Sequence, residues 1–546
     1  MRTHLLQTLV AGGLVLTGSA VSPHSTAATA PNDDRAIVHV LNRIAFGPRA
    51  GDVRRLRDLG LQRYIDEQLR PDRIADAAMD VRLAGLTTIR MTGEQIRTEF
   101  EQPQIAARRA RQLAASSSGS DPQPPALSPE QQARNNQVMR ELAEQKLLRA
   151  IYSDRQLQEV LTDFWFNHFN VDARKGRVRY LLTTYERDAI RPHILGRFRD
   201  LLEATAKSPA MLFYLDNWMS ADPHTLPFGA QDARRPVNRR QQGLNENYAR
   251  ELMELHTLGV DGGYTQKDVT EVARSFTGWT IGNPRQGGGY VFNGRLHDDG
   301  EKLVLGHRIH AGGGEHDGEQ VLDILASHPS TARFIATKLV RRFVNDTPPP
   351  ALVERAAARF RDSDGDIRAV VQTIVTSPEF LAPEAYRAKV KSPFELIVSA
   401  MRATGADVSD ATPLVRALQQ LGMPLYACQP PTGYGDDASA WVNTGAFVSR
   451  MNFALALSNN RMRGITIDDR QWMVEDQPVS SDSRHASVND RLSIAPDPQS
   501  FVVGRRVIEG VLNGAVSEAT RGTIGKATTV AQMAALALGS PEFQRR

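Results

Sequence analysis

Residues 245–259 read NENYARELMELHTLG, and residues 262–279 read GGYTQKDVTEVARSFTGW. The first run has the apolar spacing of an amphipathic helix, and Gly259 stands where such a helix ends. Thr265, followed three residues later by Asp268, is a capping-box start for a second helix. The sequence therefore predicts a tight helical hairpin, around which the rest of the chain is organised.

One face of the first predicted helix is crowded with charge. At about 100° per residue it carries Glu246, Asn247, Arg250, Glu251 and Glu254, opposite the apolar stripe. Like charges at i,i+3 spacing, such as Glu251 and Glu254, repel each other unless a cation or a shared proton compensates. An ordinary solvated helix explains the same pattern, so a functional and a purely structural interpretation both stand.

Two acids and one histidine of the hairpin are further candidates for a site. Asp268 and Glu271, on the second helix, are expected to approach the carboxylates of the first. His256 projects to the apolar side, which favours a hydrogen-bonded core histidine over a ligand. The acidic groups of the hairpin are the first candidates for chemistry.

Bulk composition excludes several classes of partner. The 546 residues contain 66 Lys and Arg against 62 Asp and Glu, and few aromatic residues interleave the basic clusters. Nucleic acid is therefore not expected as a partner. Cys428 is the single cysteine, so no intramolecular disulfide forms, and it has no sequence context that marks a nucleophile.

Residues 1–30 have the pattern of an export signal, with Arg2 before an apolar run and small residues at the end. The apolar run is too short for a stable membrane span, and no later stretch approaches 18 uninterrupted apolar residues. We therefore expect an exported protein, periplasmic or extracellular, without a membrane span.

Helical spacing dominates the remaining chain. We expect a mainly α protein, a large multi-helix globular domain with a small Gly-rich loop or β-hairpin insertion. The expected organisation is a signal peptide (1–30), an N-terminal helical segment (31–113), a polar Pro/Ser-rich linker (114–130), a core helical domain (131–463), a surface excursion (464–500) and C-terminal helices packing on the core (501–546).

The segment 164–169, FWFNHF, combines three aromatic residues with polar ones and suggests a buried helix. Buried polar groups need partners, so His168 is either a satisfied core histidine or a ligand or general base facing the carboxylate helix. The sequence leaves these two roles equal.

The composition changes between residues 277 and 318, where glycine runs surround two short apolar stretches that predict strands, 290–292 and 303–305. The glycines do not form a phosphate-binding loop, since no Gly-Lys-Ser/Thr motif occurs. His297 and Asp298, with Asp268, are weak candidates for metal ligands. The sequence leaves open whether the protein binds a divalent metal ion as a cofactor.

Several of these stretches together resemble the bacterial family catalogued as Domain of Unknown Function 1800. The resemblance rests on LNRIAFG (41–47), WFNHF (165–169), NENYARELMELHTLG (245–259), YTQKDV (264–269), FTGW (276–279), His297-Asp298 with Lys302, and Gly433-Tyr434 with Trp441. It implies an exported, mostly helical protein without an assigned activity. It also implies a co-encoded exported partner similar to alkaline phosphatases and sulfatases.

The first functional hypothesis is a carboxylate-based, metal-assisted or metal-free hydrolase acting on an envelope or extracellular polymer such as a polysaccharide. Glu251 and Glu254 would supply acid/base groups, with Arg250 and His168 completing the catalytic set. Glu246, Asn247, Trp279 and Trp441 would contact the substrate, the tryptophans by stacking on a sugar ring.

The alternative is a non-catalytic secreted binding or assembly protein that works with the co-encoded partner. In that case the polar helix face is an internal hydrogen-bonded network. The hydrolase requires a cleft that contains Glu251 or Glu254 together with His168.

Overall fold

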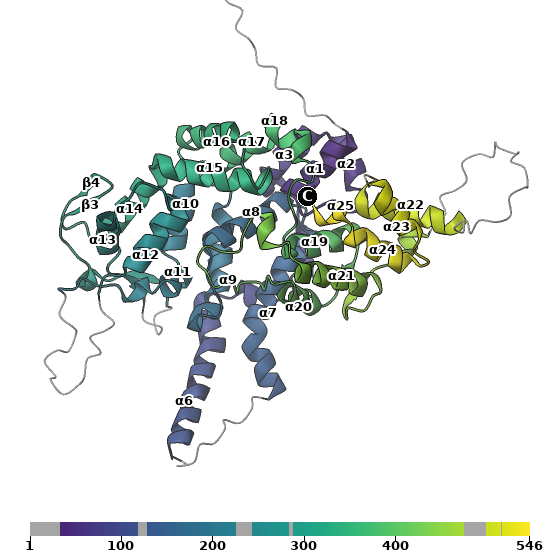
Figure 1. Ribbon diagram of the computed structural model, residues 1–546. Helices are drawn as coiled ribbons and strands as arrows, with labels where there is room; N and C mark the ends of the chain where they lie inside the picture. Colours follow the sequence, from purple (N-terminus) through teal and green to yellow (C-terminus); the bar gives the residue numbers. More distant parts are fainter. Residues whose placement is uncertain (1–32, 118–127, 225–242, 283–287, 474–497, 515) are drawn as a thin grey trace, which may run out of the picture.

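The computed structural model describes residues 33–117, 128–224, 243–282, 288–473, 498–514 and 516–546. Helices make up most of this part of the chain, as the sequence predicts, and form a broad body from which one pair of helices projects (Figure 1). The expected export signal lies outside the described residues. None of the described helices is both long and apolar enough to cross a membrane.

The N-terminal helices enter the same hydrophobic core as the rest of the molecule. They are α1 (Asp34–Ile44), α2 (Asp52–Leu59), α3 (Leu61–Gln68), α4 (Ala77–Arg82) and α5 (Gly93–Ile96). Asp33 caps α1 by accepting a hydrogen bond from the backbone N–H of Ala36 at 2.6 Å. The contiguous core cluster runs from Ile37 to Phe543, so the N-terminal segment is part of one body.

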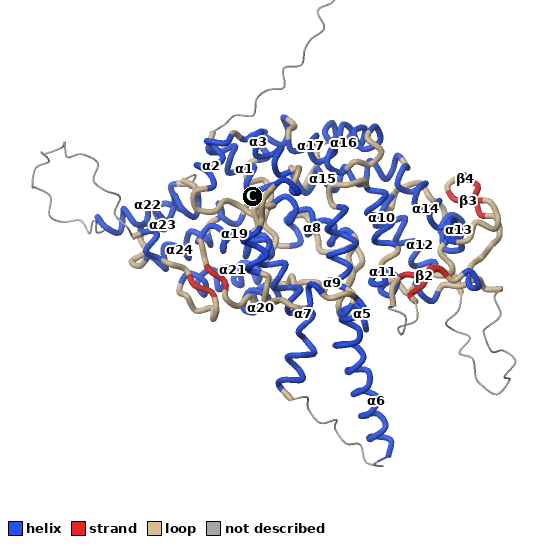
Figure 2. Tube along the Cα trace, turned by 180° about the vertical axis from the view of Figure 1, so that it is seen from behind, coloured by secondary structure: helices blue, strands red, loops and turns tan. Residues whose placement is uncertain are grey.

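A two-helix arm projects from the body. It consists of α6 (Gln102–Ser117) and the first half of α7 (Pro129–Tyr152), and both views show it standing clear of the other helices (Figures 1 and 2). Ser128 and Gln131 form a capping box at the start of α7. The helix α6 reaches Ser117 and α7 begins at Pro129, so both ends of the predicted linker segment 114–130 are helical, and its residues 118–127 lie outside the described part of the chain.

The middle of the chain contributes the helical hairpin and the helices that precede it. They are α8 (Gln156–His168), α9 (Leu182–Thr184), α10 (Phe198–Ala206), α11 (Pro209–Tyr214), α12 (Glu246–Glu251) and α13 (Gln266–Ser275). The capping box of Thr265 and Asp268 at the start of α13 is confirmed.

The described strands form three antiparallel pairs. They are β1 (Trp279–Ile281) with β2 (Tyr290–Phe292), β3 (Lys302–Val304) with β4 (His307–Ile309), and β5 (Asp407–Val408) with β6 (Ile465–Thr466). The two strand stretches predicted between 277 and 318 are confirmed as β2 and, one residue earlier than expected, β3. Leu305 and Gly306, both at positive φ, make the two-residue turn between β3 and β4.

The remaining helices complete the body and its far end. They are α14 (Glu315–Ser327), α15 (Pro329–Phe343), α16 (Pro350–Asp362), α17 (Ile367–Val375), α18 (Pro378–Leu381), α19 (Pro393–Thr404), α20 (Thr412–Gln420), α21 (Thr444–Ser458), α22 (Pro498–Leu512), α23 (Glu518–Gly525), α24 (Val530–Gly539) and α25 (Pro541–Gln544). Of the last four, α22 packs against α19 and α24 packs against α21, while α23 and α25 pack against α22 and α24.

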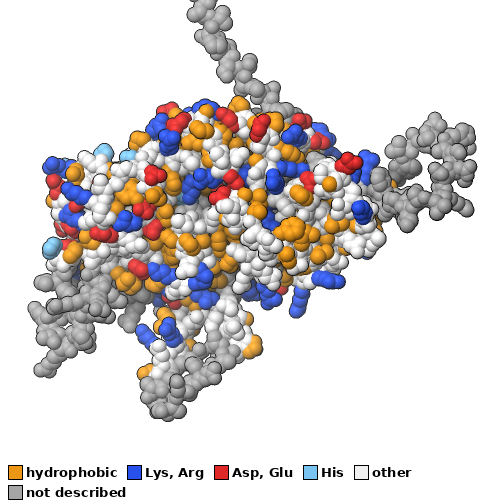
Figure 3. All heavy atoms as spheres, viewed as in Figure 1, with side chains coloured by type: hydrophobic (Ala, Val, Ile, Leu, Met, Phe, Trp, Pro, Cys, Tyr) orange, Lys and Arg blue, Asp and Glu red, His pale blue; other side chains and the backbone are white. Residues whose placement is uncertain are grey.

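The surface mixes both signs of charge, and apolar side chains gather on the face around α21 (Figure 3). Phe447, Val448 and Leu455 of that helix are exposed. Mixed charge of this kind agrees with the balanced composition of the chain.

Candidate functional site

The first helix of the hairpin is not a regular α-helix throughout. After α12, residues Leu252–Thr257 form a π-helical segment, in which Leu258 N donates to Met253 O at 2.8 Å. The hydroxyl of Thr257 donates to Leu252 O at 2.7 Å and satisfies a carbonyl in the widened turn. The expectation of one uniform helix is wrong here, and π-turns of this kind are frequent at functional sites.

The polar face of the hairpin is largely paired within itself. Glu246 accepts hydrogen bonds from Gln266 at 2.9 Å and from Thr270 at 3.1 Å. Arg250 donates to Gln266 at 2.7 Å and lies 3.7 Å from Glu254, which also accepts from the hydroxyl of Tyr264. These contacts tie α12 to the chain that follows it, as an internal network would.

Asp268 and Glu271 are hydrogen-bonded to the β3–β4 hairpin and to their own helix. Asp268 accepts from the backbone N–H of Leu305 at 2.8 Å, and Glu271 accepts from that of Leu303 at 3.0 Å. Glu271 satisfies an N–H group on the edge of β3, and Asp268 satisfies one in the turn that follows it, because an edge strand offers unpaired N–H groups.

Glu251, on α12, has a partly buried carboxylate. Burial, together with the neighbouring charge of Glu254, raises its pKa, and Arg250 opposes that effect. Asn247, predicted to bind substrate, is exposed on the same helix.

The three candidates for metal ligands are each engaged by hydrogen-bond partners from the protein. His297 is buried, with Nε2 3.1 Å from Asp317, which also accepts from Lys302 at 2.5 Å. Asp298 binds Arg274 through two hydrogen bonds of 2.7 and 3.0 Å. No group of three His, Cys, Asp or Glu side chains converges as metal ligands would in the part of the chain that the structure describes.

The two candidate tryptophans differ in exposure. Trp279 is fully buried and packs edge-on against Phe276 and Tyr290, so its ring offers no face to a sugar. Trp441 is 9 % exposed and lies at the wall of a pocket, with its indole N–H donating to Gly435 O at 3.1 Å.

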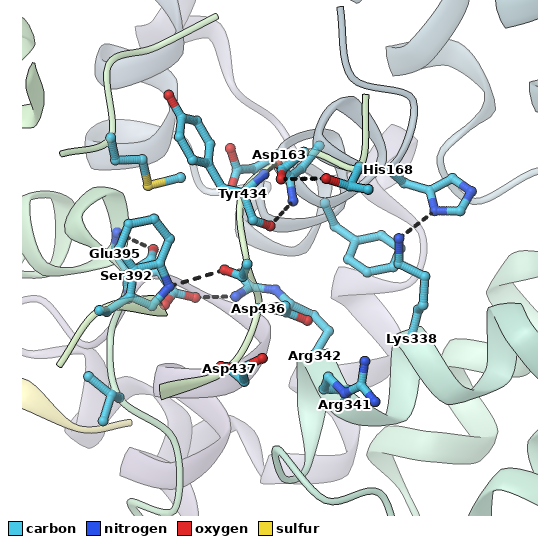
Figure 4. A pocket seen from close by; sticks show the side chains of 18 of the residues that line it. Asp163, His168, Lys338, Arg341, Arg342, Ser392, Glu395, Tyr434, Asp436 and Asp437 are labelled. Carbon is cyan, nitrogen blue, oxygen red and sulfur yellow. Dashed lines mark hydrogen bonds and ion pairs between the residues drawn. The ribbon is translucent and has the colours of Figure 1, made fainter. Parts of the chain in front are cut away.

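That pocket, of about 340 Å³, lies between α8, α15, the start of α19 and the loop of residues 423–441 (Figure 4). Charged and polar groups make up most of its lining. They are Asp163, Asn167, His168, Lys338, Arg341, Arg342, Ser392, Glu395, Thr432, Tyr434, Asp436, Asp437 and Arg546. We refer to this cavity as the Lys338 pocket.

His168 and Lys338 are joined at its wall. Lys338 Nζ lies 2.9 Å from His168 Nδ1, and Figure 4 shows the lysine pointing toward the imidazole. His168 Nε2 lies 3.1 Å from the carbonyl oxygen of His256, in the π-helical segment. Because a carbonyl only accepts, Nε2 carries the proton and Nδ1 accepts from Lys338. The hairpin therefore reaches the pocket through a backbone carbonyl rather than through its carboxylates.

The electrostatics of this pair favour neutral groups. Burial, with the nearby charges of Lys338 and His256, lowers the pKa of His168 well below its usual range. Burial also lowers the pKa of Lys338 to about 8, while Asp436 opposes and Arg341 adds to the effect. A lysine in this range is a usable base near neutral pH.

A fixed ion cluster forms the opposite wall. Burial would raise the pKa of Glu395, but Arg342 and Arg546 hold it well below its ordinary value. Arg546 Nε lies 3.0 Å from Glu395, and Arg342 donates a hydrogen bond to the same carboxylate. This carboxylate is therefore a permanent charge, not a proton carrier.

Asp436 lies between these walls (Figure 4). Its charge raises the pKa of Lys338 and of Arg342, yet no described residue donates a hydrogen bond to its carboxylate. A carboxylate that faces cations without a fixed partner is free to bind a ligand or a water molecule.

Helix α8 holds the loop that carries Asp436. Tyr434 N donates to the Asn167 side chain at 2.7 Å, and the same side chain donates back to Tyr434 O at 2.9 Å. Gly433 has φ 74°, and a Cβ there would lie 2.6 Å from Asn167 Oδ1. Only glycine permits this approach, which explains why the Gly433-Tyr434 pair occurs beside the WFNHF motif.

Of the predicted site residues, the structure brings His168 and Trp441 together in the pocket. Glu251, Glu254 and Arg250 do not line it. The cleft that the first hypothesis required, with these carboxylates beside His168, is therefore not the one observed.

Sequence reasoning missed Lys338 and Asp436. Lys338 lies on α15, whose apolar stripe is evident in the sequence, while its charged residues have the spacing of an ordinary solvated face. The signal available was the sequence KLVRR (338–342), three cations on one short stretch, of which Arg342 falls on the apolar stripe itself, seven residues after Ile335.

The residues of the pocket come from segments far apart in the chain. A family match that covers nearly the whole sequence, described next, includes all of these segments. Comparison with curated proteins and with solved structures gave no match. The family described as "Protein of unknown function (DUF1800)" matches residues 39–545. The chain belongs to the DUF1800 family.

Proposed function

We propose that the protein is an exported hydrolase acting on an envelope or extracellular polymer such as a polysaccharide, and that the Lys338 pocket is its reacting site. The observation that carries this proposal is the Lys338 amine, 2.9 Å from His168 and facing the unpaired carboxylate of Asp436. Two titratable groups in contrasting environments are the usual basis of acid/base chemistry. Export is supported by the sequence pattern of residues 1–30.

In the reaction we propose, neutral Lys338 accepts a proton from water while Asp436 accepts a hydrogen bond from the other O–H. The water oxygen attacks a carbonyl carbon, such as that of an ester carried by the polymer. The positive charge of Arg341 stabilises the developing oxyanion. The bond to the leaving alcohol then breaks, and the Lys338 ammonium returns the proton to it.

The size of the pocket limits the substrate. About 340 Å³ is at the lower end of the ~300–1,000 Å³ typical of small-molecule sites. We therefore propose that one substituent or one chain end enters the pocket, with Trp441 beside it. The polymer itself stays outside.

The test is a hydrolysis screen of the purified full chain on acylated and unsubstituted polysaccharides and on simple esters. We expect kcat/KM to rise about tenfold per pH unit up to a pH of about 8, because Lys338 must lose its proton. Lys338→Met should lower turnover by roughly 10²–10⁴-fold and remove that pH limb. Lys267→Met, at an exposed lysine of α13, is the matched control. Native activity and an unchanged profile in Lys338→Met would disprove the assignment.

A second candidate is the non-catalytic binding or assembly protein. The observation that favours it is the paired polar face of the hairpin, in which Glu246, Arg250 and Glu254 all have partners. This candidate predicts that polysaccharide or the co-encoded partner binds the full chain without turnover, and that Lys338→Met leaves the affinity unchanged.

A further inference from the structure

A second cavity lies at the base of the projecting arm. Its volume is about 640 Å³, and it is bordered by the segment that leads into α6 and by the chain around α9 and α11. Its charged and hydroxyl-bearing lining residues are Thr92, Glu94, Arg97, Glu101, Arg177, Tyr180, Thr184, Asp188, Ser208 and Tyr290. None of these residues lines the Lys338 pocket. We refer to this cavity as the arm-base cavity.

Arg97 is the unusual residue of this cavity. It begins the π-helical segment Arg97–Glu101, between α5 and α6, and is only 6 % exposed. Its Nε and Nη1 are buried, and no acceptor among the residues that the structure describes reaches either of them. It forms no ion pair with any described acid. Burying a guanidinium without an acceptor is costly, so such a group in a native protein calls for a ligand or another function.

The neighbours of Arg97 do not supply the missing acceptor. Arg177 engages the buried Glu101 at 2.9 Å. Asp188 is held by Arg187 through hydrogen bonds of 2.6 and 2.7 Å. Glu94, the remaining acid of the lining, is exposed. The acids of the cavity are thus either committed elsewhere or turned to solvent.

The hydroxyl of Tyr180 is a second donor in this cavity that would bind the same kind of ligand as Arg97. Tyr180 is 6 % exposed, and its buried hydroxyl has no hydrogen-bond partner in the described part of the chain. Tyr180, Arg177 and Glu101 also line an adjoining cavity of about 750 Å³ between α6 and α7. That cavity adds three more arginines, Arg108, Arg134 and Arg179. The positive charge therefore continues outward from Arg97 along the arm.

We propose that the arm-base cavity binds an oxyanion, the phosphate, sulfate or carboxylate group of a small ligand, between Arg97 and Tyr180. The planar guanidinium fork matches two oxygens of such a group, and the phenol supplies a third hydrogen bond. The neighbouring arginines attract the anion to the cavity mouth. This site is independent of the reaction proposed at Lys338.

The proposal predicts different effects of Arg97→Gln on the melting temperature in the absence and in the presence of an anion. Without an anion, Arg97→Gln removes a buried charge that has no acceptor, so the melting temperature of the variant should equal or exceed that of the native chain. With an anion, the native chain should gain melting temperature and the variant should not. A purely structural arginine would give the reverse order, since its loss would lower the melting temperature in every buffer.

The experiment is calorimetric titration and thermal melting of the full chain with inorganic phosphate, sulfate and glucuronate, each at ionic strength matched with chloride. Arg97→Gln should weaken binding about 10- to 100-fold, the loss expected for charge-assisted hydrogen bonds. Tyr180→Phe should weaken it less. Arg109→Gln, at an exposed arginine of α6 that lines neither cavity, is the matched control and should bind normally.

A response to glucuronate alone would identify a uronic acid carboxylate as the ligand group. A response to phosphate or sulfate alone would identify a tetrahedral oxyanion. If Arg97→Gln does not fold, Arg97→Lys keeps the charge, loses the fork and should still weaken binding. The proposal is overturned if the native chain binds none of the three anions, or if the Arg97 variants bind them as tightly as the native chain.

Discussion

In the hairpin of α12 and α13, Glu246 and Glu254 accept hydrogen bonds from Gln266 and Tyr264, so their charge serves to hold two chain segments together. In the Lys338 pocket, Asp436 faces cations without accepting a hydrogen bond from any described residue. Charged groups gather in both regions, but those of the hairpin are paired with neighbouring side chains and Asp436, among the described residues, is not. Crowding of acids in a sequence therefore does not distinguish a structural network from a reacting site. The feature that distinguishes them is the presence of unpaired groups beside a cavity.

The two regions are nevertheless connected. The π-helical segment that follows α12 presents the carbonyl of His256 to His168, which in turn accepts from Lys338. We interpret the hairpin as the support that fixes the imidazole tautomer. Changes in the pocket should therefore have larger effects than changes on the polar face of the hairpin.

The largest loss of stability is expected for Glu395→Gln. The change removes the carboxylate shared by Arg342 and Arg546 and leaves two buried cations unpaired, at a cost of about 3–5 kcal/mol. The pKa of Glu395 is lowered in the folded state, so its contribution is full above the unfolded value of about 4.3 and is lost as the pH falls below it. Denaturant unfolding between pH 3 and 7 measures this. Equal pH dependence in the variant and the native chain would contradict the role assigned to this pair.

A smaller but specific effect is expected for Asp436→Asn. Turnover should fall by about 10²-fold, equivalent to about 2.7 kcal/mol, because the water loses its second acceptor. Asp436 also raises the pKa of Lys338, so its removal should shift the alkaline rise of kcat/KM to a pH below 8. A pH–rate profile of the variant checks both effects. A shift to higher pH would show that the two groups do not interact as described.

Gly433→Ala should destabilise the loop that carries Asp436 by about 1–3 kcal/mol. The added Cβ would lie 2.6 Å from Asn167 Oδ1, and φ 74° disfavours any side chain. Thermal melting measures the loss, and Gly422→Ala is the matched control, since that glycine also has positive φ but open space around it. Equal losses at the two glycines would mean that backbone strain alone acts at Gly433.

The smallest effect is expected on the hairpin. Glu254→Gln weakens the hydrogen bond from Tyr264 and the contact with Arg250, and should cost about 1 kcal/mol of folding stability. Turnover at the Lys338 pocket should be unchanged. Urea unfolding and the hydrolysis assay measure the two quantities separately.

The sequence allowed much of the local structure to be predicted, because local structure depends on neighbouring residues. Thr265 and Asp268 form the capping box that their spacing indicates, and the strands at 290–292 and 302–304 lie where apolar stretches alternate with glycine. The mainly helical fold followed from the same periodicities. The family resemblance was confirmed by a match over residues 39–545.

The site was harder to predict because it depends on contacts between distant segments. Lys338 and His168 are 170 positions apart, and Asp436 comes from a third segment. No spacing rule links such residues. The π-helical turn that brings the His256 carbonyl to His168 is also invisible in the helical periodicity, since one widened turn barely alters the apolar stripe.

The most direct test of where the chemistry occurs is the ratio of hydrolysis rates of Lys338→Met and Glu254→Gln, measured on one substrate at equal folded fractions. We expect Glu254→Gln to retain the native rate and Lys338→Met to fall by roughly 10²–10⁴-fold. The opposite ratio, with Lys338→Met active and Glu254→Gln inactive, would show that the reacting site lies on the hairpin. It would contradict the assignment of the chemistry to Lys338.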